Sequence, residues 1–381
     1  MKRFRIIALL PLLAVLGGCN AVVLNPAGDI AVQQRDLVVI STILMLLIIL
    51  PVMALTAFFA WHYRQSNTSA QYDPDWAHST HLELIIWSAP LLIIICLGAV
   101  TWMATHMLDP YRPISRTTPG ATAAEIKKPL NVQVVALDWK WLFIYPDYGI
   151  ATVNEMAAPL DQPINFKITA SSVMNAFYVP ALAGMVYAMP GMQTQLHAVI
   201  NKPGTFKGFS ANYSGSGFSE MRFNFIGADQ AGFDKWVADV KASGGSTLGR
   251  TEYLDLERPS EAVPVKKYAS IDPQIFHLIL NMCVQPGKMC THEMAAIDAK
   301  GGLGLAGAYN VQDIEYDKSA RRGSDPMVKK SYVASVCTKA APMGMDVQAA
   351  EVTPISATPL LGAGLPRPSM FQSFAPKPSN S

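Results

Sequence analysis

The chain has 381 residues, of which 50% are hydrophobic and 15% are charged, whereas an ordinary soluble domain has roughly 25% charged residues. Lysine and arginine number 30 and aspartate and glutamate 28, so the net charge is +2. The apolar composition excludes a disordered chain, and the balanced charge excludes a protein that binds nucleic acid through overall charge. Most of the excess apolar residues precede residue 108, which predicts a membrane part followed by a water-soluble part.

Residues 1–18 have the pattern of a secretory signal peptide. Basic residues precede an apolar run, Ile6 to Leu16, that is too short to span a bilayer. The small residues before Cys19 resemble the bacterial lipobox, in which this cysteine becomes the first residue after cleavage and carries the lipid. A plain signal peptide or an uncleaved anchor is the alternative. With a lipobox, residues 19–36 form a periplasmic N-terminal segment.

Two long apolar runs follow, residues 37–61 and 84–105, and neither contains a charged side chain. Each run is long enough to cross about 30 Å of hydrocarbon as a helix. Two spans return the chain to its starting side of the membrane. We therefore expect the loop 62–83 in the cytoplasm, and the linker 106–129 and everything after it in the periplasm.

Glu83 stands at the first turn of the second predicted span, on the cytoplasmic edge in this topology. A carboxylate at this position interacts favourably with the N-terminus of a helix, and interfacial depth costs far less than the bilayer centre. Capping of the helix is therefore one interpretation, and a group that collects protons is the other. Cys96, inside the second span, is expected to be a reduced and packed thiol.

The pattern changes in residues 130–228 to short runs of alternating apolar and polar residues, separated by glycine, proline and asparagine. Examples are residues 131–137, 164–168 and 193–200. Such runs at this spacing predict a small β-sandwich or Greek-key barrel. His197 falls in the last run and is expected to be a surface or hydrogen-bonded histidine. A helix is expected from Phe233 to Lys241.

Several stretches of the chain are similar to subunit II of haem-copper terminal oxidases, namely residues 139–143, 173–180, 189–191 and 210–221. With the two-span hairpin, the resemblance covers residues 19–282. Its last part, 229–282, resembles the aromatic-rich segment that follows the cupredoxin domain in these subunits. The resemblance implies a membrane-anchored α plus all-β protein, in which a two-helix transmembrane hairpin precedes a periplasmic cupredoxin-like Greek-key β-sandwich.

In the cytochrome c oxidase branch of this family, the cupredoxin domain holds a binuclear copper centre. The corresponding positions in this chain are Asn175, Ser210, Asn212, Ser214, Phe218 and Met221, of which only the methionine matches the ligand pattern. Hydroxyls, amides and a phenyl ring do not replace the bridging thiolates and the imidazoles that this copper chemistry requires. We therefore expect Met221 to be a packing residue and expect no metal in this chain. The loss of these ligands resembles the quinol oxidase branch, particularly the cytochrome o ubiquinol oxidases.

The resemblance implies a non-catalytic subunit of a proton-translocating ubiquinol oxidase in the bacterial inner membrane. This chain would bind no cofactor, and the haems and copper would lie in subunit I. The implied partners are subunit I, the smaller membrane subunits, membrane lipids and ubiquinol, without nucleic acid or cytochrome c. Glu83 resembles an acid near the start of a proton pathway into subunit I. Trp139 and Trp141, with no metal acceptor nearby, are expected to make packing or membrane-proximal contacts.

The alternative function comes from another class of protein, a copper chaperone or assembly-scaffold lipoprotein with a cupredoxin-like domain. Metal delivery requires exposed methionine and histidine clusters, and only residues 289 to 294 suggest one. Co-purification with haem-bearing subunits would distinguish this alternative from the oxidase subunit.

Residues 283–381 form a tail that first contains cysteine and methionine and then becomes rich in proline. Cys283 and Cys290 flank a Pro-Gly turn in an oxidising compartment, which favours a disulfide. A soft-metal site that also uses Met289, His292 and Met294 is the alternative. Cys337 has no obvious partner. From Gly301 onward the composition predicts a poorly ordered extension.

Overall fold

The computed structural model describes residues 21–71, 75–114, 116–118 and 128–302. It also describes the backbone of two short antiparallel strands, β14 (Val311–Asp313) and β15 (Ser331–Val333). The expected lipid attachment residue Cys19, the remaining cysteine Cys337 and most of the predicted extension lie outside the described residues.

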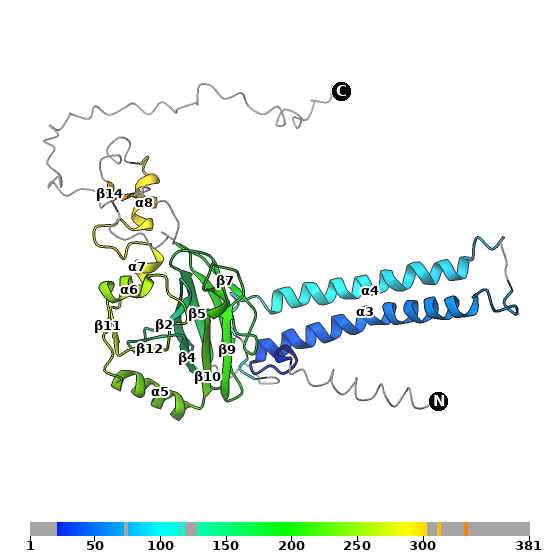
Figure 1. Ribbon diagram of the computed structural model, residues 1–381, viewed down its shortest axis with the longest axis horizontal. Coiled ribbons are helices and arrows are strands. Elements are labelled where there is room, and N and C mark those ends of the chain that lie inside the picture. The colour runs from blue at the N-terminus through cyan, green and yellow to red at the C-terminus, as the bar shows by residue number, and fades with distance from the viewer. Residues whose placement is uncertain are drawn as a thin grey trace, which may run out of the picture. The chain divides into compact units, whose positions relative to one another are not determined.

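Two long helices, α3 (Asp29–His62) and α4 (Thr80–Met107), contain the two predicted spans and run alongside each other (Figure 1). A short 3-10 helix, η1 (Val22–Leu24), precedes them. Both long helices are apolar enough to cross a membrane. They extend beyond the predicted apolar runs because helical hydrogen bonding continues into the polar residues at the ends of each run.

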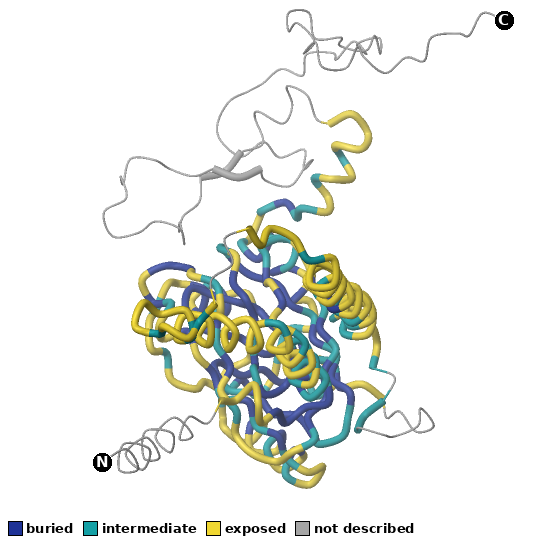
Figure 2. The backbone as a smooth tube through the Cα atoms, turned by 90° about the vertical axis from the view of Figure 1, so that its right-hand side faces the viewer, coloured by how far each residue is buried: buried dark blue, intermediate teal, exposed yellow. Residues whose placement is uncertain are grey.

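Most side chains of these two helices are exposed, as the yellow tube in Figure 2 shows. Cys96 on α4 is a free and exposed cysteine. The expectation of a packed thiol is therefore wrong for this chain alone, because a two-helix hairpin covers only part of each helix surface. The uncovered apolar surface is available to lipid or to other membrane helices.

Two β-sheets form the domain after the hairpin, and they confirm the predicted β-sandwich. The first sheet has the order β12-β3-β2-β1-β5-β8 and the second has the order β4-β10-β9-β6-β7. The strands of the first sheet are β1 (Leu130–Leu137), β2 (Lys140–Tyr145), β3 (Ile150–Val153), β5 (Pro163–Ala170), β8 (Thr194–Val199) and β12 (Lys266–Tyr268). Those of the second are β4 (Glu155–Pro159), β6 (Asn175–Tyr178), β7 (Val186–Ala188), β9 (Gly204–Ser210) and β10 (Arg222–Ala228). The three predicted alternating runs correspond to β1, β5 and β8.

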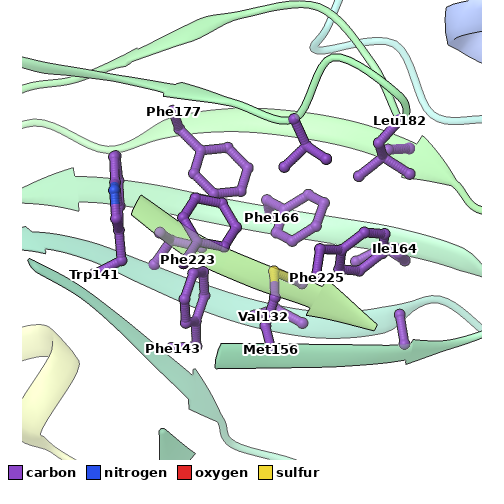
Figure 3. Close-up of a cluster of buried hydrophobic side chains, with 14 of the residues drawn as sticks. Val132, Trp141, Phe143, Met156, Ile164, Phe166, Phe177, Leu182, Phe223 and Phe225 are labelled. Atoms are coloured by element: carbon purple, nitrogen blue, oxygen red, sulfur yellow. The ribbon is translucent and has the colours of Figure 1, made fainter. Parts of the chain in front are cut away.

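An aromatic cluster fills the space between the two sheets (Figure 3). Phe177 stacks on Phe223 with ring centroids 5.4 Å apart and meets the edge of Trp141 at 5.4 Å. Phe143 and Phe166 are also fully buried in this cluster. Successive side chains of a strand point to opposite faces of its sheet, so alternate aromatic residues of the strands meet in one core.

A second core covers the other face of the first sheet. It joins side chains of β1 and β2, such as Leu137 and Leu142, to Tyr253, Leu256 and Phe276 from the segment after the sandwich. That segment contains α5 (Gln230–Ala242), β11 (Thr247–Leu248), α6 (Arg250–Glu257), β13 (Ser270–Ile271), α7 (Ile275–Leu280) and α8 (Thr291–Asp298). The helix expected at 233–241 is confirmed as α5. Strand β12 comes from the same segment and pairs with β3, so the first sheet extends beyond residue 228.

Candidate functional site

The six positions that correspond to copper ligands come together at one end of the second sheet. They lie at the start of β6, at the end of β9 and in the loop that leads through the 3-10 helix η3 (Phe218–Glu220) to β10. Four of them are buried, namely Asn175, Ser210, Ser214 and Met221. Asn212 and Phe218 are half-buried.

Hydrogen bonds between the polar members occupy this cluster. Ser210 Oγ lies 3.0 Å from Asn175 Oδ1 and 3.2 Å from the carbonyl oxygen of Asn212. The amide of Asn212 donates to the carbonyl of Met174 at 3.1 Å, and Ser214 Oγ lies 4.0 Å from the sulfur of Met221. Each of the four polar side chains thus has a hydrogen-bond partner within or beside the cluster.

This donor set does not fit a binuclear copper centre. Hydroxyls and carboxamides are neutral, hard donors, whereas bridged copper requires soft thiolates and terminal imidazoles. The sulfur of Met221 is the only soft atom among the six side chains, and it is buried at 1% exposure within the aromatic core. Across the part of the chain that the structure describes, no three histidine, cysteine, aspartate or glutamate side chains form a group that could hold a metal ion.

The two tryptophans near the cluster pack, as expected. Trp139 donates its indole N–H to the carbonyl of Ser214 at 3.1 Å. A Cβ atom at Gly217 would lie 2.6 Å from the Trp139 ring, so the absence of a side chain there allows the indole to cover the loop. Trp141 is fully buried in the aromatic core. Trp139 therefore fixes the loop that carries Ser214, and Trp141 packs in the core between the sheets.

Lys140, between these tryptophans, is a buried cation that the sequence analysis missed. Its ammonium donates to the carbonyls of Asp138 (3.2 Å) and Arg258 (2.8 Å) and to the hydroxyl of Ser260. Burial lowers the pKa of Lys140 from 10.5 to about 8, a shift that the nearby Asp138 partly opposes. The sequence signal that could have indicated this burial is the position of the lysine between two tryptophans of the core. The contacts join β2 to the segment after α6.

Glu83 lies in the first turn of α4, as predicted, and its backbone N–H donates to the carbonyl of Ser79 at 3.0 Å. Its carboxylate Oε1 lies 2.6 Å from Nδ1 of His78. Both side chains are well exposed, at 47% for Glu83 and 67% for His78. The structure therefore pairs the predicted acid with a histidine from the preceding loop, a contact that the sequence analysis did not anticipate.

Cys283 and Cys290 form a disulfide, with Cα atoms 4.8 Å apart. The bond occupies the two thiolates that the alternative soft-metal site would have used. His292 instead lies beside His277, with ring centroids 5.2 Å apart. Elsewhere, the ring of His197 lies 3.1 Å from the carbonyl of Pro110, in agreement with a hydrogen-bonded histidine.

Two family models match the part of the chain that contains this cluster and the segment after it. Residues 149–225 match the family described as cytochrome c oxidase subunit II, periplasmic domain. Residues 241–287 match the family described as the COX aromatic rich motif. Two apolar helices followed by these two units are the architecture of the second subunit of a haem-copper terminal oxidase.

Curated proteins of similar sequence show to which branch of the haem-copper oxidases this chain belongs. A cytochrome bo(3) ubiquinol oxidase subunit 2 from Pseudomonas aeruginosa is 49% identical over 266 residues, which cover 70% of this chain and 77% of that protein. The protein of the same name from Pseudomonas putida is 48% identical over 283 residues, 74% of this chain and 87% of the relative. A ubiquinol oxidase subunit 2 from Acetobacter aceti is 47% identical, with 70% and 84% covered. This chain belongs to the ubiquinol oxidase subunit 2 family of haem-copper oxidases.

Among solved structures, the periplasmic domain of subunit II of cytochrome oxidase from Bradyrhizobium japonicum is 24% identical, with a TM-score of 0.30. It covers 31% of this chain and 99% of that chain.

Membership of the ubiquinol oxidase subunit 2 family makes subunit I a partner and makes the protein an inner-membrane protein with a periplasmic domain. It supports the oxidase-subunit interpretation over a copper chaperone.

Proposed function

We propose that this chain is a subunit without a redox centre in a proton-translocating oxidase that transfers electrons from ubiquinol to oxygen. The observation that carries the proposal is the neutral, hydrogen-bonded cluster around Asn175 and Ser210, where a copper centre would need thiolates and imidazoles. Ubiquinol arrives within the bilayer and can reduce a haem directly, so no periplasmic copper relay from cytochrome c is required. The haems and copper that reduce oxygen are those of subunit I.

The first contribution of the chain is to assembly. Helices α3 and α4 expose apolar side chains along most of their length, and such surface packs against the helices of subunit I, the smaller membrane subunits or lipid. A lipid on Cys19 adds a second anchor on the periplasmic side, since a single acyl chain supplements a spanning hairpin. Deletion of the hairpin is expected to prevent assembly.

The second contribution is proton uptake at the cytoplasmic end of α4. Glu83 and His78 are exposed and lie 2.6 Å apart, a distance within which a proton can pass directly between an imidazole and a carboxylate. Both nitrogens of an imidazole can carry a proton, so His78 can accept one from water and deliver it to Glu83. Glu83 then supplies the proton pathway of subunit I.

Substitution of these residues in the whole complex tests the proton role. Glu83→Gln is expected to lower turnover and proton uptake, because an amide cannot pass on a proton as a carboxylate does, with normal haem content. His78→Asn is expected to have a smaller effect of the same kind, because Glu83 remains exposed to water. His81→Asn, in the same first turn of α4, is the matched control. Rates of Glu83→Gln that match those of the unmodified complex at every pH would contradict the proton role.

Spectroscopy and substrate tests examine the redox assignment separately. The complex, purified through a tag on this chain, is expected to show haem bands, no near-infrared band of binuclear copper, and oxygen consumption with ubiquinol but not with reduced cytochrome c. A near-infrared copper band or turnover with cytochrome c would show that the ligand assignment at Ser210 and Ser214 is wrong. A preparation without haem would favour an assembly scaffold.

A further inference from the structure

Two histidines lie beside each other on the surface of the segment after the sandwich. His277 is on α7 and His292 is in the first turn of α8, and both side chains are exposed. Their ring centroids are 5.2 Å apart, and the ring planes are inclined at 64°. Imidazole is the commonest metal ligand among protein side chains, so two adjacent imidazoles from different helices form a candidate binding site.

The ring nitrogens of this pair are available to a ligand. Among the residues that the structure describes, neither the imidazole of His277 nor that of His292 has a hydrogen-bond partner. The ring of His197, in contrast, lies 3.1 Å from the carbonyl of Pro110. A neutral imidazole has one nitrogen that donates and one that accepts. His277 and His292 therefore each keep an acceptor nitrogen that can bind a metal ion.

The separation of the two rings fits a shared ion. A zinc–nitrogen bond of about 2.05 Å places the centre of a ligating imidazole about 3.2 Å from the ion. Two such ligands at a tetrahedral angle have ring centres about 5.2 Å apart, which is the separation observed between His277 and His292. The χ2 torsion of histidine is broad. At these exposed positions it can turn one nitrogen of each ring toward the same ion.

The backbone around the pair already holds the two helices together. A disulfide between Cys283 and Cys290 links the residues after α7 to the residue before α8. The backbone N–H and the hydroxyl of Thr291 both donate to the carbonyl of Asn281 at 2.9 Å. An ion that binds between the histidines therefore does not have to bring α7 and α8 together, which reduces the free energy spent on ordering.

The donor set defines the class of ion. Imidazole suits zinc, copper(II) and nickel ions, whereas magnesium and calcium prefer oxygen ligands. Copper(I) prefers sulfur, but Cys283 and Cys290 are joined in their disulfide and Met289 is buried at 3% exposure. Two histidines leave two positions of a tetrahedral ion to water. Such a site is compatible with the absence, within the described ranges, of any metal-binding group of three or more histidine, cysteine or acidic side chains.

We infer that His277 and His292 form a surface site for a divalent transition-metal ion, with Zn²⁺ as its simplest occupant. The ion joins α7 to α8 beside the disulfide, where the chain passes from the aromatic-rich segment 229–282 into the tail. Zn²⁺ has no redox chemistry. The site therefore goes beyond the proposed function and leaves the chain without a redox centre.

Protection of individual histidines in the purified complex tests this inference. The complex is first treated with a chelator to remove loosely bound metal. It is then modified with diethyl pyrocarbonate at increasing Zn²⁺ concentration, and peptide mass spectrometry measures the modification of each histidine. We expect Zn²⁺ to protect His277 and His292 with one common midpoint, whereas Mg²⁺ protects neither. His106, which is exposed at the end of α4, should react at the same rate throughout.

Substitutions separate metal binding from simple contact between the rings. His277→Phe keeps an aromatic ring beside His292 but removes one ligand. The Zn²⁺ concentration that protects His292 should then rise about 100-fold, because the two ligands no longer act together. His292→Gln should have the same effect on His277, and it provides the test if His277→Phe disturbs α7. His106→Gln is the matched control and should leave the midpoint unchanged.

Three results would overturn the inference. Unchanged reactivity of His277 and His292 in the presence of Zn²⁺ would show that the rings make only an aromatic contact. Equal protection of His106 would show that Zn²⁺ binds exposed histidines without selection. An unchanged midpoint for His292 in His277→Phe would show that the two histidines do not share an ion.

Discussion

Replacement of Lys140 by methionine is expected to remove a pH dependence from the stability of the β-domain. The pKa of Lys140 is about 8 in the folded chain, below its ordinary value of 10.5, because burial disfavours the ammonium. Below pH 8 the group is charged in both the folded and the unfolded chain, and its burial costs stability. Between pH 8 and 10.5 the unfolded chain binds more protons than the folded chain, so stability rises with pH.

The size of this effect follows from the two pKa values. Between pH 7 and pH 9, a group that shifts from 10.5 to about 8 on folding increases the free energy of unfolding by about 1.3 kcal/mol. That change corresponds to about 4 °C in the midpoint of thermal unfolding of a domain of this size. Burial also raises the pKa of Tyr253 and Tyr268. Raised tyrosine values reduce stability only above about pH 10, outside this interval.

The assay is thermal unfolding of the detergent-solubilised complex at pH 7 and pH 9, followed by tryptophan fluorescence. The unmodified chain should gain about 1.3 kcal/mol relative to Lys140→Met over this interval. Lys207→Met, which removes an exposed ammonium on β9, serves as the control and should leave the gain unchanged. Parallel pH profiles of the unmodified chain and Lys140→Met would refute the assignment of a lowered pKa to this lysine.

Three further changes test the packing. Phe177→Ala removes a fully buried ring from the centre of the aromatic core and should lower the free energy of unfolding by about 3–5 kcal/mol. The control Tyr213→Ala, at a 75% exposed position, should change this free energy by less than about 0.5 kcal/mol. Equal effects of the two variants in thermal unfolding would disprove the assignment of Phe177 to the core. Asp229→Ala removes the side chain that accepts the N–H of Gly232 at the start of α5 and should cost about 1 kcal/mol, measurable as faster hydrogen exchange in that helix. Cys290→Ser opens the loop closed with Cys283 and should lower local stability by about 2–3 kcal/mol, seen as faster proteolysis between α7 and α8; an unchanged cleavage rate would argue against the disulfide as a local constraint.

The features that sequence patterns predicted are those that depend on near neighbours in the chain. Alternation of apolar and polar residues predicted β1, β5 and β8 because one face of each strand is buried against a core. Runs without charge predicted the apolar parts of α3 and α4, and the short ligand motif located the cluster from Asn175 to Met221. In each case a few neighbouring residues determine the structural feature, so the feature can be recognised from a short stretch of sequence.

The features that the sequence analysis missed depend on partners far away in the chain. Lys140 is held by the carbonyl of Arg258, 118 residues later, and Asp29 pairs with Arg116, 87 residues later. An aspartate at the start of a helix is ordinarily solvated, so the local pattern around Asp29 gives no sign of burial. Only the packing of α3 and β2 against later segments removes these charges from water.

The cluster at the positions that correspond to copper ligands also shows how neutral side chains hold this part of the fold together. A metal ion stabilises only the folded chain and links the segments that supply its ligands. Here the hydroxyl of Ser210 links β9 to Asn175 on β6, and the indole of Trp139 fixes the following loop through the carbonyl of Ser214. The same segments are therefore joined by neutral hydrogen bonds. Such bonds need no metal to join β6, β9 and the loop after β9.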